Sequence, residues 1–302
     1  MKIIITGGSG FIGSNLIEFY LKKGVEVFNL DIQFPKNKVH YKYWRNVDLA
    51  NYNSLFALIR EIEPTHIIHL AGRTDLKTKI NDDYSINVVS VKNIIECCKY
   101  DTRIKRVIFA STMLVNQTGY KPKNILDYNP NTEYGKSKVF GENIVLKNKN
   151  LSTDFCIIRP TSIWGEGFKE PYKNFFDLLL SGRFFHPGNN ASKKTMGYIG
   201  NSIYQIDKLL FADAKEIRNR IFYIGDNPSV NISTWADEIA SLAGIKNPKK
   251  LPIFIFKLLG FIGDFLFKIG VEFPMTSYRL KNMTTDQVHN LDETYKICGD
   301  PP

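Results

Sequence analysis

The chain has 302 residues, which is enough for one large domain or two modest ones with an ample core. Its hydrophobic share of 43% and charged share of 23% are ordinary for a globular protein. The net charge of +10 raises nucleic-acid binding as a candidate, but no block of basic residues interleaved with aromatics occurs. We therefore expect no nucleic-acid partner, and we attribute the functional part of the charge to attraction of a diphosphate ligand or an anionic surface.

The cysteines show no metal-ligand spacing; they are Cys97, Cys98, Cys156 and Cys298. Cys97 and Cys98 are adjacent within an apolar-periodic segment, which is more typical of a buried helix face than of a redox pair. We expect reduced thiols, no metal and a cytoplasmic protein. The apolar run Lys2–Ile5 is too short for a signal peptide.

The first half of the chain alternates short apolar runs with amphipathic stretches. Strands are predicted at Lys2–Ile5, Val25–Asp31, His66–Leu70, Arg106–Ser111 and Phe155–Arg159. Helices are predicted between and after them at Gly13–Lys23, Ser54–Glu61, Tyr84–Lys99 and Tyr134–Lys147. Strands separated by helices imply an α/β fold with a Rossmann-type, doubly wound parallel sheet.

After Pro160 the pattern loosens, and Gly, Pro and aromatic residues cluster in 164–190. One more strand is predicted at Ile221–Ile224, and a helix at Ser233–Leu242 with Ser233 as its N-cap. We expect residues 1–165 to form the sheet domain, with 195–225 returning to it. Residues 166–194 and 226–302 would then form a smaller, C-terminal substrate-binding region.

The segment Leu251–Gly270 is strongly apolar, and its charged residues are Lys257, Asp264 and Lys268. Two cations, an acid and three glycines argue against a membrane span. The break at Gly260-Phe-Ile-Gly263 predicts two short helices. They would cover the core of the substrate-binding region, the cleft or a dimer contact, and peripheral contact of 251–270 with a membrane is the alternative.

A glycine-rich string, Thr6-Gly7-Gly8-Ser9-Gly10-Phe11-Ile12-Gly13, follows the first strand and opens the first helix. Gly7, Gly10 and Gly13 suit a tight turn, close approach of the backbone to a pyrophosphate, and close packing of helix on strand. The helix N-terminus offers N–H groups and a positive dipole end to phosphates. A turn without a ligand is the alternative, but the order strand, turn, helix, strand favours a dinucleotide site.

Asp31 closes the second strand, 18 residues after Gly13. A carboxylate there can accept both ribose hydroxyls and would repel a 2′-phosphate, so NAD is the expected cofactor and 1–165 the NAD-binding domain. Lys36 and Lys38 keep NADP open, and an ordinary strand-end acid is the other interpretation. Asp48 is a candidate partner for the adenine amino group.

Tyr134 and Lys138 stand at i and i+4, hence on one face of a helix. An ammonium and an oxidised nicotinamide nearby should lower the pKa of the phenol from about 10, so that Tyr134 acts as general base or acid toward a substrate hydroxyl. A Tyr-x-x-x-Lys pair alone is common on solvated helices, but after a phosphate cradle the catalytic interpretation is favoured. Ser111 and Thr112 lie at the carboxyl edge of the fourth strand, where a hydroxyl can bond the same oxygen; a strand-end cap is the alternative.

Together these residues resemble the extended short-chain dehydrogenase/reductase family, in its NAD-dependent nucleotide-sugar epimerase/dehydratase branch, over nearly the whole chain. Other matching segments are His69–Gly72, Asn87, Phe109–Thr112, Ile158–Pro160, Trp164-Gly165, Tyr198–Asn201 and Tyr223–Gly225. The resemblance implies that Thr112, Tyr134 and Lys138 are catalytic. It implies a cofactor site made of Gly7, Gly10, Phe11, Ile12, Gly13, Asp31, Asp48, Leu49, Leu70, Ala71, Gly72, Asn87, Tyr134, Lys138 and Pro160.

The chain also departs from the family pattern. Met113 and Leu114 stand where dehydratases of this branch carry an Asp-Glu pair, which argues against 4,6-dehydration. Ser162 stands where an Asn often holds the substrate's phosphates, and Lys194 where an Arg often does, so Thr112, Ser162 and Lys194 are the candidate substrate-binding residues. Lysine keeps the charge but loses the bidentate fork.

The leading hypothesis is an NAD-dependent nucleotide-sugar 4-epimerase that oxidises a sugar hydroxyl to a 4-keto intermediate and reduces it from the other face. An NAD(P)-dependent keto-sugar reductase or a sterol-type dehydrogenase of the same fold is the alternative. A non-enzymatic NAD sensor ranks last because Tyr134 and Lys138 are both present. The resemblance further implies a nucleotide-diphosphate sugar substrate, a role in polysaccharide biosynthesis and a homodimer.

Overall fold

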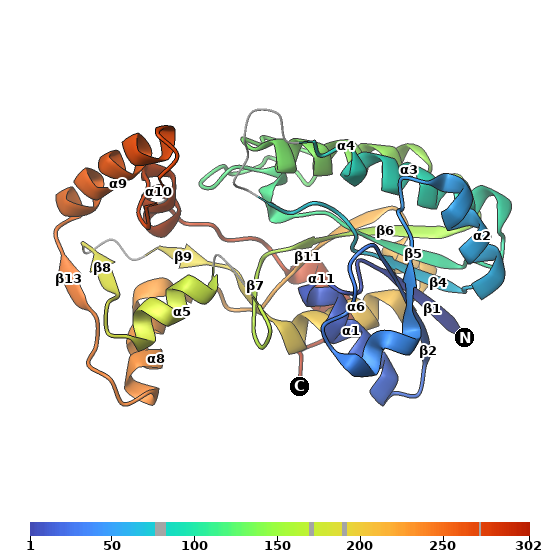
Figure 1. Cartoon of the computed structure of the whole chain (residues 1–302), viewed down its shortest axis with the longest axis horizontal. Helices are drawn as coiled ribbons and strands as arrows, with labels where there is room; N and C mark the ends of the chain where they lie inside the picture. Colours follow the sequence, from blue (N-terminus) through green and yellow to red (C-terminus); the bar gives the residue numbers. More distant parts are fainter. Residues whose placement is uncertain (76–82, 169–171, 189–191, 272) are drawn as a thin grey trace.

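A seven-stranded parallel sheet forms the centre of the computed structural model, which describes residues 1–75, 83–168, 172–188, 192–271 and 273–302 (Figure 1). Its spatial order is β3-β2-β1-β4-β5-β6-β11, and every neighbouring pair is parallel. The strands are β1 (Lys2–Thr6), β2 (Glu26–Asp31), β3 (Trp44–Asn46), β4 (His66–His69), β5 (Arg106–Ala110), β6 (Asp154–Pro160) and β11 (Arg220–Ile224). They read as nearly continuous apolar runs because both faces of the sheet are covered.

Helices cover the two faces of the sheet (Figure 1). One face carries α1 (Phe11–Lys22), α6 (Ile199–Phe211) and α11 (Asp292–Cys298); the other carries α2 (Tyr52–Ile62), α3 (Ile86–Tyr100) and α4 (Glu133–Lys147). Each layer encloses its own large apolar cluster. The predicted α/β class with a Rossmann-type doubly wound sheet is therefore confirmed.

The helices and strands predicted from apolar periodicity are all present, with ends within two residues of those expected. The first helix begins at Phe11 and not at Gly13, because Gly10 is its extended N-cap. Several short elements carry no clear periodicity and were not predicted: the 3-10 helices η1 (Lys38–Tyr43) and η2 (Met113–Val115), the strand β3, and the helix α7 (Ala214–Ile217).

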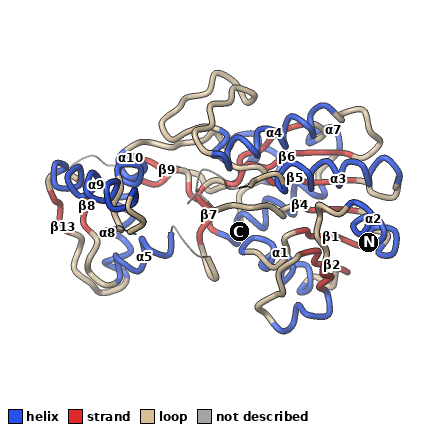
Figure 2. Tube along the Cα trace, turned by 45° about the horizontal axis from the view of Figure 1, so that its top comes forward, coloured by secondary structure: helices blue, strands red, loops and turns tan. Residues whose placement is uncertain are grey.

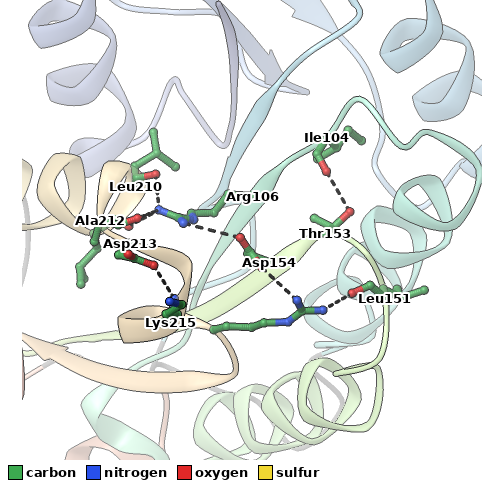
Figure 3. Close-up of polar contacts among 11 residues, drawn as sticks. Ile104, Arg106, Leu151, Thr153, Asp154, Leu210, Ala212, Asp213 and Lys215 are labelled. Atoms are coloured by element: carbon green, nitrogen blue, oxygen red, sulfur yellow. Dashed lines mark hydrogen bonds and ion pairs between the residues drawn. The ribbon is translucent and has the colours of Figure 1, made fainter.

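Arg106, the first residue of β5, joins the sheet to the helix α6 at the end of the sheet away from the glycine-rich turn (Figure 3). Its buried guanidinium donates hydrogen bonds to the carbonyls of Leu209, Leu210 and Ala212 at the end of α6, at 2.8–3.2 Å. It also lies 3.6 Å from Asp154 at the start of β6. These contacts satisfy carbonyls that a helix C-terminus leaves without partners, and they join α6 to two central strands.

A second, smaller lobe lies at one end of the molecule (Figures 1 and 2). It contains α5 (Tyr172–Leu180), β8 (Phe185–Pro187), α8 (Ile232–Leu242), β13 (Lys249–Leu251), α9 (Ile253–Lys268) and α10 (Ser277–Thr284). Two small ribbons, β7 (Ser162–Trp164) with β10 (Met196–Tyr198) and β9 (Lys193–Lys194) with β12 (Val230–Asn231), adjoin it. Part of the stretch 164–190 lies outside the described residues.

The predicted N-cap of α8 is wrong. Asn231, not Ser233, caps the helix, because its Oδ1 accepts hydrogen bonds from the backbone N–H groups of Ser233 and Thr234 at 3.0 and 3.2 Å. Asn and Ser are similarly good N-caps, so sequence alone does not choose between two candidates this close together.

The predicted pair of helices in Leu251–Gly270 is also wrong, since α9 runs unbroken from Ile253 to Lys268. Gly260 and Gly263 do not end the helix. A Cβ on Gly263 would lie only 1.7 Å from the carbonyl oxygen of Met275, and one on Gly260 would lie 3.2 Å from the backbone nitrogen of Ser277. The two glycines therefore let the segment that leads into α10 pack directly on the α9 backbone.

The cysteines are unpaired and buried, and Cys97 and Cys98 lie on the core face of α3 as predicted. Burial raises the pKa of the Cys97 thiol to about 12 and that of Cys98 further. Among the described residues, no His, Cys, Asp and Glu side chains are grouped to hold a metal ion. None of the described helices combines the length and the apolarity needed to cross a bilayer.

Candidate active site

The glycine-rich turn lies between β1 and α1, at the carboxyl edge of the sheet. Gly7 has a φ of +69°, and a Cβ there would lie 2.8 Å from the backbone of Ala71. A Cβ on Gly13 would lie 2.4 Å from the carbonyl oxygen of Gly7. These positions admit only glycine because the turn is packed between the ends of β1 and β4 and the first turn of α1.

The same turn leaves the start of α1 without a side-chain cap. Gly10 is the N-cap residue and offers no side chain to the first-turn N–H groups of the helix. A Cβ built on Gly10 meets only the carbonyl oxygen of Gly7, at 3.2 Å. An uncapped helix N-terminus suits a phosphate group, so these residues fit a dinucleotide.

Asp31 stands at the end of β2, where the sequence predicts the ribose contact. Its Oδ2 accepts a hydrogen bond from Ser9 N at 3.0 Å, and its Oδ1 accepts one from Gln33 N at 2.9 Å. The carboxylate thus holds the glycine turn beside β2 and stays half-buried. A carboxylate oxygen can accept a second hydrogen bond, so these contacts leave capacity for ribose hydroxyls.

Two other candidate cofactor residues, Asp48 and Leu49, contact neighbouring parts of the protein. The Oδ1 of Asp48 accepts a hydrogen bond from Ala50 N at 2.9 Å, which closes the turn before α2. Leu49 is buried in the apolar cluster between the sheet and α2–α3. The remaining candidates lie along the same edge: Phe11 and Ile12 in the first turn of α1, Leu70 and Ala71 after β4, and Pro160 at the end of β6.

Thr112 and Tyr134 meet at the carboxyl edge of β5. Thr112 follows the strand and caps η2, with its Oγ1 accepting a hydrogen bond from Leu114 N at 3.2 Å. Tyr134 lies in the first turn of α4 and is buried. A hydrogen bond from Thr112 lowers the pKa of Tyr134, but burial outweighs it and raises that pKa to about 12.

The expected lowering of the Tyr134 pKa is therefore not found in the chain by itself. Burial removes water from the phenolate, and Lys138 is directed elsewhere, with its Nζ donating a hydrogen bond to the carbonyl of Ala110 at 2.9 Å. Burial also lowers the pKa of Lys138 to about 8, against an opposing effect of Glu142. A cationic group bound beside Tyr134 would favour the phenolate and shift its pKa downward.

Asn87 holds the loop after β4 against Lys138. Its side chain accepts a hydrogen bond from Arg73 N at 2.7 Å and donates to Arg73 O at 3.0 Å and to Ser137 Oγ at 2.9 Å. A Cβ on Gly72 would lie 2.7 Å from Asn87 Oδ1 and 3.2 Å from Lys138 Nζ. Gly72, Asn87 and Lys138 therefore converge, and Ser137 joins them although no sequence signal beyond its place between Tyr134 and Lys138 marks it.

Beneath this group lies a buried histidine whose contacts the sequence does not reveal. His69 Nδ1 is 2.8 Å from Thr6 Oγ1, and its Nε2 is 3.2 Å from Ser90 Oγ. Thr6 Oγ1 also accepts a hydrogen bond from Ala71 N at 3.2 Å. Burial first, and then the charge of Lys138, lowers the pKa of His69 to about 3, so the ring is neutral and ties β1 to the turn after β4.

A buried ion pair fixes the helix that carries Tyr134 and Lys138. Arg159 in β6 donates from Nε and Nη2 to the two carboxylate oxygens of Glu142, at 2.9 and 2.7 Å. Glu142 lies one turn after Lys138 on α4, and its Oε2 also accepts a hydrogen bond from Tyr128 at 2.8 Å. Two parallel hydrogen bonds set the position of α4 along the sheet.

The candidate phosphate-binding residues lie on the short ribbons beside the lobe. Ser162 in β7 pairs with Met196 in β10, and Lys194 stands two residues before Met196. Lys194 is buried, which lowers its pKa to about 8 although Asp286 opposes the shift. The ribbons bring Ser162 and Lys194 near one another, on a different element from Thr112, Tyr134 and Lys138.

The positions after Thr112 carry no ionisable side chain. Met113 and Leu114 belong to η2, followed by Val115 and Asn116. Asn116 instead has a structural role, since its Oδ1 accepts a hydrogen bond from Asn129 N at 2.6 Å. The edge of β5 thus carries Thr112, Tyr134 and Lys138 without an adjacent carboxylate pair, an arrangement whose hydroxyl groups could exchange a proton with a bound hydroxyl or carbonyl.

Comparison with known proteins shows which family the chain belongs to. Residues 3–181 match the NAD dependent epimerase/dehydratase family, and the chain belongs to that family, whose cofactor is NAD. One relative is the N-acetyl-α-D-glucosaminyl-diphospho-ditrans,octacis-undecaprenol 4-epimerase of Escherichia coli O157:H7, 25% identical over 93% of this chain and 84% of the relative. Another is a 3-β-hydroxysteroid dehydrogenase of Mycolicibacterium neoaurum, 26% identical over 82% of this chain and 71% of the relative.

Among solved structures, a UDP-glucose 4-epimerase of Thermotoga maritima with UDP-glucose superposes with a TM-score of 0.74. It is 16% identical, and the match covers all of this chain and 94% of that one. The likeness shows a common fold along the whole chain, including the lobe.

Proposed function

We propose that the protein is an NAD-dependent 4-epimerase of a diphosphate-linked sugar, with a nucleotide as the leading carrier. The observation that carries the proposal is the group Thr112, Tyr134 and Lys138 at the carboxyl edge of β5, with apolar Met113 and Leu114 where elimination of water would need an acid and a base. Such a site can oxidise and reduce a hydroxyl but lacks groups for dehydration.

NAD, when bound, would supply the hydride acceptor for the C4–H bond and return the hydride later. Tyr134 takes the proton of the C4 hydroxyl as that hydroxyl becomes a carbonyl, and gives it back after the keto sugar has turned its other face to the cofactor. Thr112 donates a hydrogen bond to the same oxygen. The charge of the bound cofactor would stabilise the phenolate, as would the ammonium of Lys138 once it turns from Ala110 O, its partner in the chain by itself. The cycle leaves no net oxidation of the sugar.

We assign the cofactor to the uncapped start of α1, Asp31, the turn around Gly72, and the Tyr134–Lys138 face. The substrate would lie between this edge and the region formed by 166–194 and 226–302, with Ser162 and Lys194 near its diphosphate. Because Lys194 is a point charge on a flexible stem, it would hold the diphosphate less rigidly than an arginine fork. We further propose a homodimeric, cytoplasmic enzyme that supplies sugars for polysaccharides.

The test is to incubate the purified enzyme and NAD with single UDP- and dTDP-sugars, and with a polyprenyl-diphosphate sugar, the substrate type in the name of the Escherichia coli relative. We expect two C4 epimers to reach equilibrium by NMR with no net NADH formed. Lys138→Met should slow the reaction and weaken NAD binding. Net, stoichiometric consumption of a reduced cofactor with no epimer would contradict the proposal.

A second candidate is a reductase or sterol-type dehydrogenase, which the hydroxysteroid dehydrogenase relative and the apolar helix α9 favour. It uses the same three catalytic residues but requires an exchangeable cofactor. Steady NADH formation from a 3-β-hydroxysteroid, or steady NADPH oxidation by a keto sugar, would support this candidate over epimerisation.

A further inference from the structure

Helix α9 presents an uncovered apolar face. Phe254, Leu258, Phe261, Ile262 and Phe265 are exposed, with 66% of the first, 71% of Phe261 and 60% of Phe265 accessible to solvent. Their spacing of i, i+4, i+7, i+8 and i+11 places them within about 100° of the helix circumference. Single exposed apolar residues are ordinary, but a continuous face of this kind marks an interaction site.

The exposed face is separate from the side of α9 that packs on the rest of the protein. The residues that α9 buries are Phe256, Gly260 and Gly263, which lie on the opposite side of the helix. The two glycines contact the segment that leads into α10, where a Cβ would clash with Met275 or crowd Ser277. Because the packing side of α9 is already in use, the exposed side has no further role inside the described part of the chain. The expectation that 251–270 covers the core is therefore wrong for most of its large side chains.

Basic residues flank the apolar face. Lys257 and Lys268 lie along one edge of it by helical position, and Lys249 and Lys250 are exposed just before the helix. The segment 246–281 contains seven Lys and Arg residues and two Asp and Glu residues. Among the residues that the structure describes, Lys249, Lys250, Lys257 and Lys268 form no ion pair. The surface is thus apolar in its centre and cationic at its border.

We propose that α9 docks flat on the surface of an anionic lipid bilayer, with its phenylalanines in the acyl boundary and its lysines at the headgroups. A helix of 16 residues is about 24 Å long, shorter than the roughly 30 Å of a hydrocarbon core, so it lies on the membrane and does not cross it. Large aromatics on one face and lysines beside them are the composition of such interfacial helices.

The charge distribution favours a lipid surface over a second copy of the chain. In an antiparallel symmetric dimer the same patch faces itself with the lysine edges of the two copies on the same side, so these edges would be brought together. Like charges in an interface oppose association, whereas anionic headgroups neutralise every lysine at once.

The docking helix packs against α10, and α10 connects to the candidate substrate site. At the end of α10, Asn282 accepts a hydrogen bond from Thr118 Oγ1 at 2.8 Å, and Met283 O accepts one from Ser192 Oγ at 2.7 Å. Beyond it, Gln287 exchanges backbone hydrogen bonds with the strand that contains Lys194, at 2.9 and 3.0 Å. A membrane-bound α9 would therefore hold the phosphate-binding end of the site close to the headgroups.

The experiment is flotation of the full chain with vesicles of phosphatidylcholine alone or of phosphatidylcholine with phosphatidylglycerol. We expect the protein to float with the anionic vesicles at low salt and less so at high salt. Phe261→Ser with Phe265→Ser should weaken partitioning at least roughly tenfold. Lys257→Gln with Lys268→Gln should weaken binding to anionic vesicles by roughly fivefold or more for each lysine that reaches the headgroups.

The matched control removes two similarly exposed aromatics from the sheet domain, Tyr100 at the end of α3 and Phe140 on α4, as Tyr100→Ser with Phe140→Ser. It should float like the wild type. Thermal melting followed by circular dichroism checks that each variant is folded. Because all the substituted positions are exposed, we expect unchanged melting temperatures.

Two outcomes overturn the proposal. One is a folded wild type that stays out of the lipid fraction with both vesicle types at low salt; if it then sediments as a larger species than the Phe261→Ser/Phe265→Ser variant, the face is a contact between copies. The other is a Phe261→Ser/Phe265→Ser variant that floats as well as the control.

Discussion

The sheet domain and the lobe that carries α9 are stabilised in different ways. The sheet buries apolar side chains on both faces, in two large clusters with α1, α6 and α11 on one side and α2–α4 on the other. The buried apolar cluster of the lobe consists of Leu179, Phe184, Ala236 and Ala240, with a few partly buried neighbours. Helices on both faces bury the strands of the parallel sheet, whereas the lobe keeps much of its apolar surface exposed to solvent.

This difference indicates a division of roles. The proposed proton-transfer residues, Tyr134 and Lys138, lie on the sheet domain, where the Glu142–Arg159 pair and the bond from Asn87 to Ser137 hold their helix. The groups that would choose the substrate and its location lie on the lobe and its ribbons. Measurements that separate chemistry, stability and binding can therefore test the comparison one region at a time.

The largest effect is expected in the sheet domain, from Tyr134→Phe. Removing the hydroxyl deletes a proton carrier and no packing group, so kcat should fall about 10²–10⁴-fold while NAD binding and the melting temperature are kept. The control is Tyr84→Phe, whose ring centroid lies 6.3 Å from that of Tyr134. It should lose far less activity. A Tyr134→Phe enzyme with near wild-type turnover would remove Tyr134 from the mechanism.

The next largest effect is expected on the free energy of unfolding, and it should differ between two phenylalanines on α9. Phe256 is 5% exposed and Phe261 is 71% exposed. Phe256→Ala should lower the free energy of unfolding by about 3 kcal/mol because it leaves a cavity, and Phe261→Ala should change it by no more than about 0.5 kcal/mol. Urea titration of both variants measures this. Equal losses would mean that Phe261 is packed in solution and that the lobe has a larger core than the structure shows.

A smaller effect concerns acid stability, and it belongs to the sheet domain. His69 has a pKa of about 3 in the folded chain against 6.5 unfolded, because its buried ring resists protonation. Below pH 6.5 the unfolded state binds the extra proton, so stability falls as the pH drops from 6.5 toward 3. By pH 5 the loss from this group is about 2 kcal/mol.

The matching variant is His69→Gln, which has no titrating ring. Its free energy of unfolding should depend less on pH between 7 and 5 than that of the wild type. If both proteins lose the same stability over this range, His69 is protonated without penalty and the interpretation of the Thr6–His69–Ser90 contacts is wrong.

The smallest effect is on cofactor choice. Asp31→Asn removes the charge that would repel a 2′-phosphate, and the amide can still accept the hydrogen bond from Ser9 N. The ratio of NADP to NAD affinity should rise about tenfold, by calorimetric titration with both cofactors. An unchanged ratio would mean that the discrimination comes from elsewhere, for instance from Lys36 and Lys38.

The difference between the sheet domain and the lobe also explains how much of the structure could be predicted from the sequence. Apolar periodicity located six of the seven strands of the sheet and the helices α1 to α4, because their burial depends on local pattern, and the glycine spacing located the turn before α1. The strand β3 and the helices α6 and α11, which cover one face of the sheet, were not predicted. The partners of His69, the Glu142–Arg159 pair and the role of Asn87 join residues far apart in the chain, so no local pattern reveals them. In the lobe, Gly260 and Gly263 resemble helix breakers because glycine marks both turns and close helix contacts, and only the position of Met275 distinguishes the two.

The contact of Gly263 with the Met275 backbone means that the positions of α9 meet two different requirements. Some positions are needed for folding, and others would be needed for binding at the exposed face. At Gly263 every L side chain collides with backbone, so a library randomised there should yield folded protein only with glycine, whatever the growth condition. Phe261 and Phe265 each lie two residues from Gly263, but their side chains are exposed. At these two positions folding should tolerate nearly any residue. Selection for folded protein and selection for binding to anionic vesicles should therefore return different sequences from the same sixteen-residue helix.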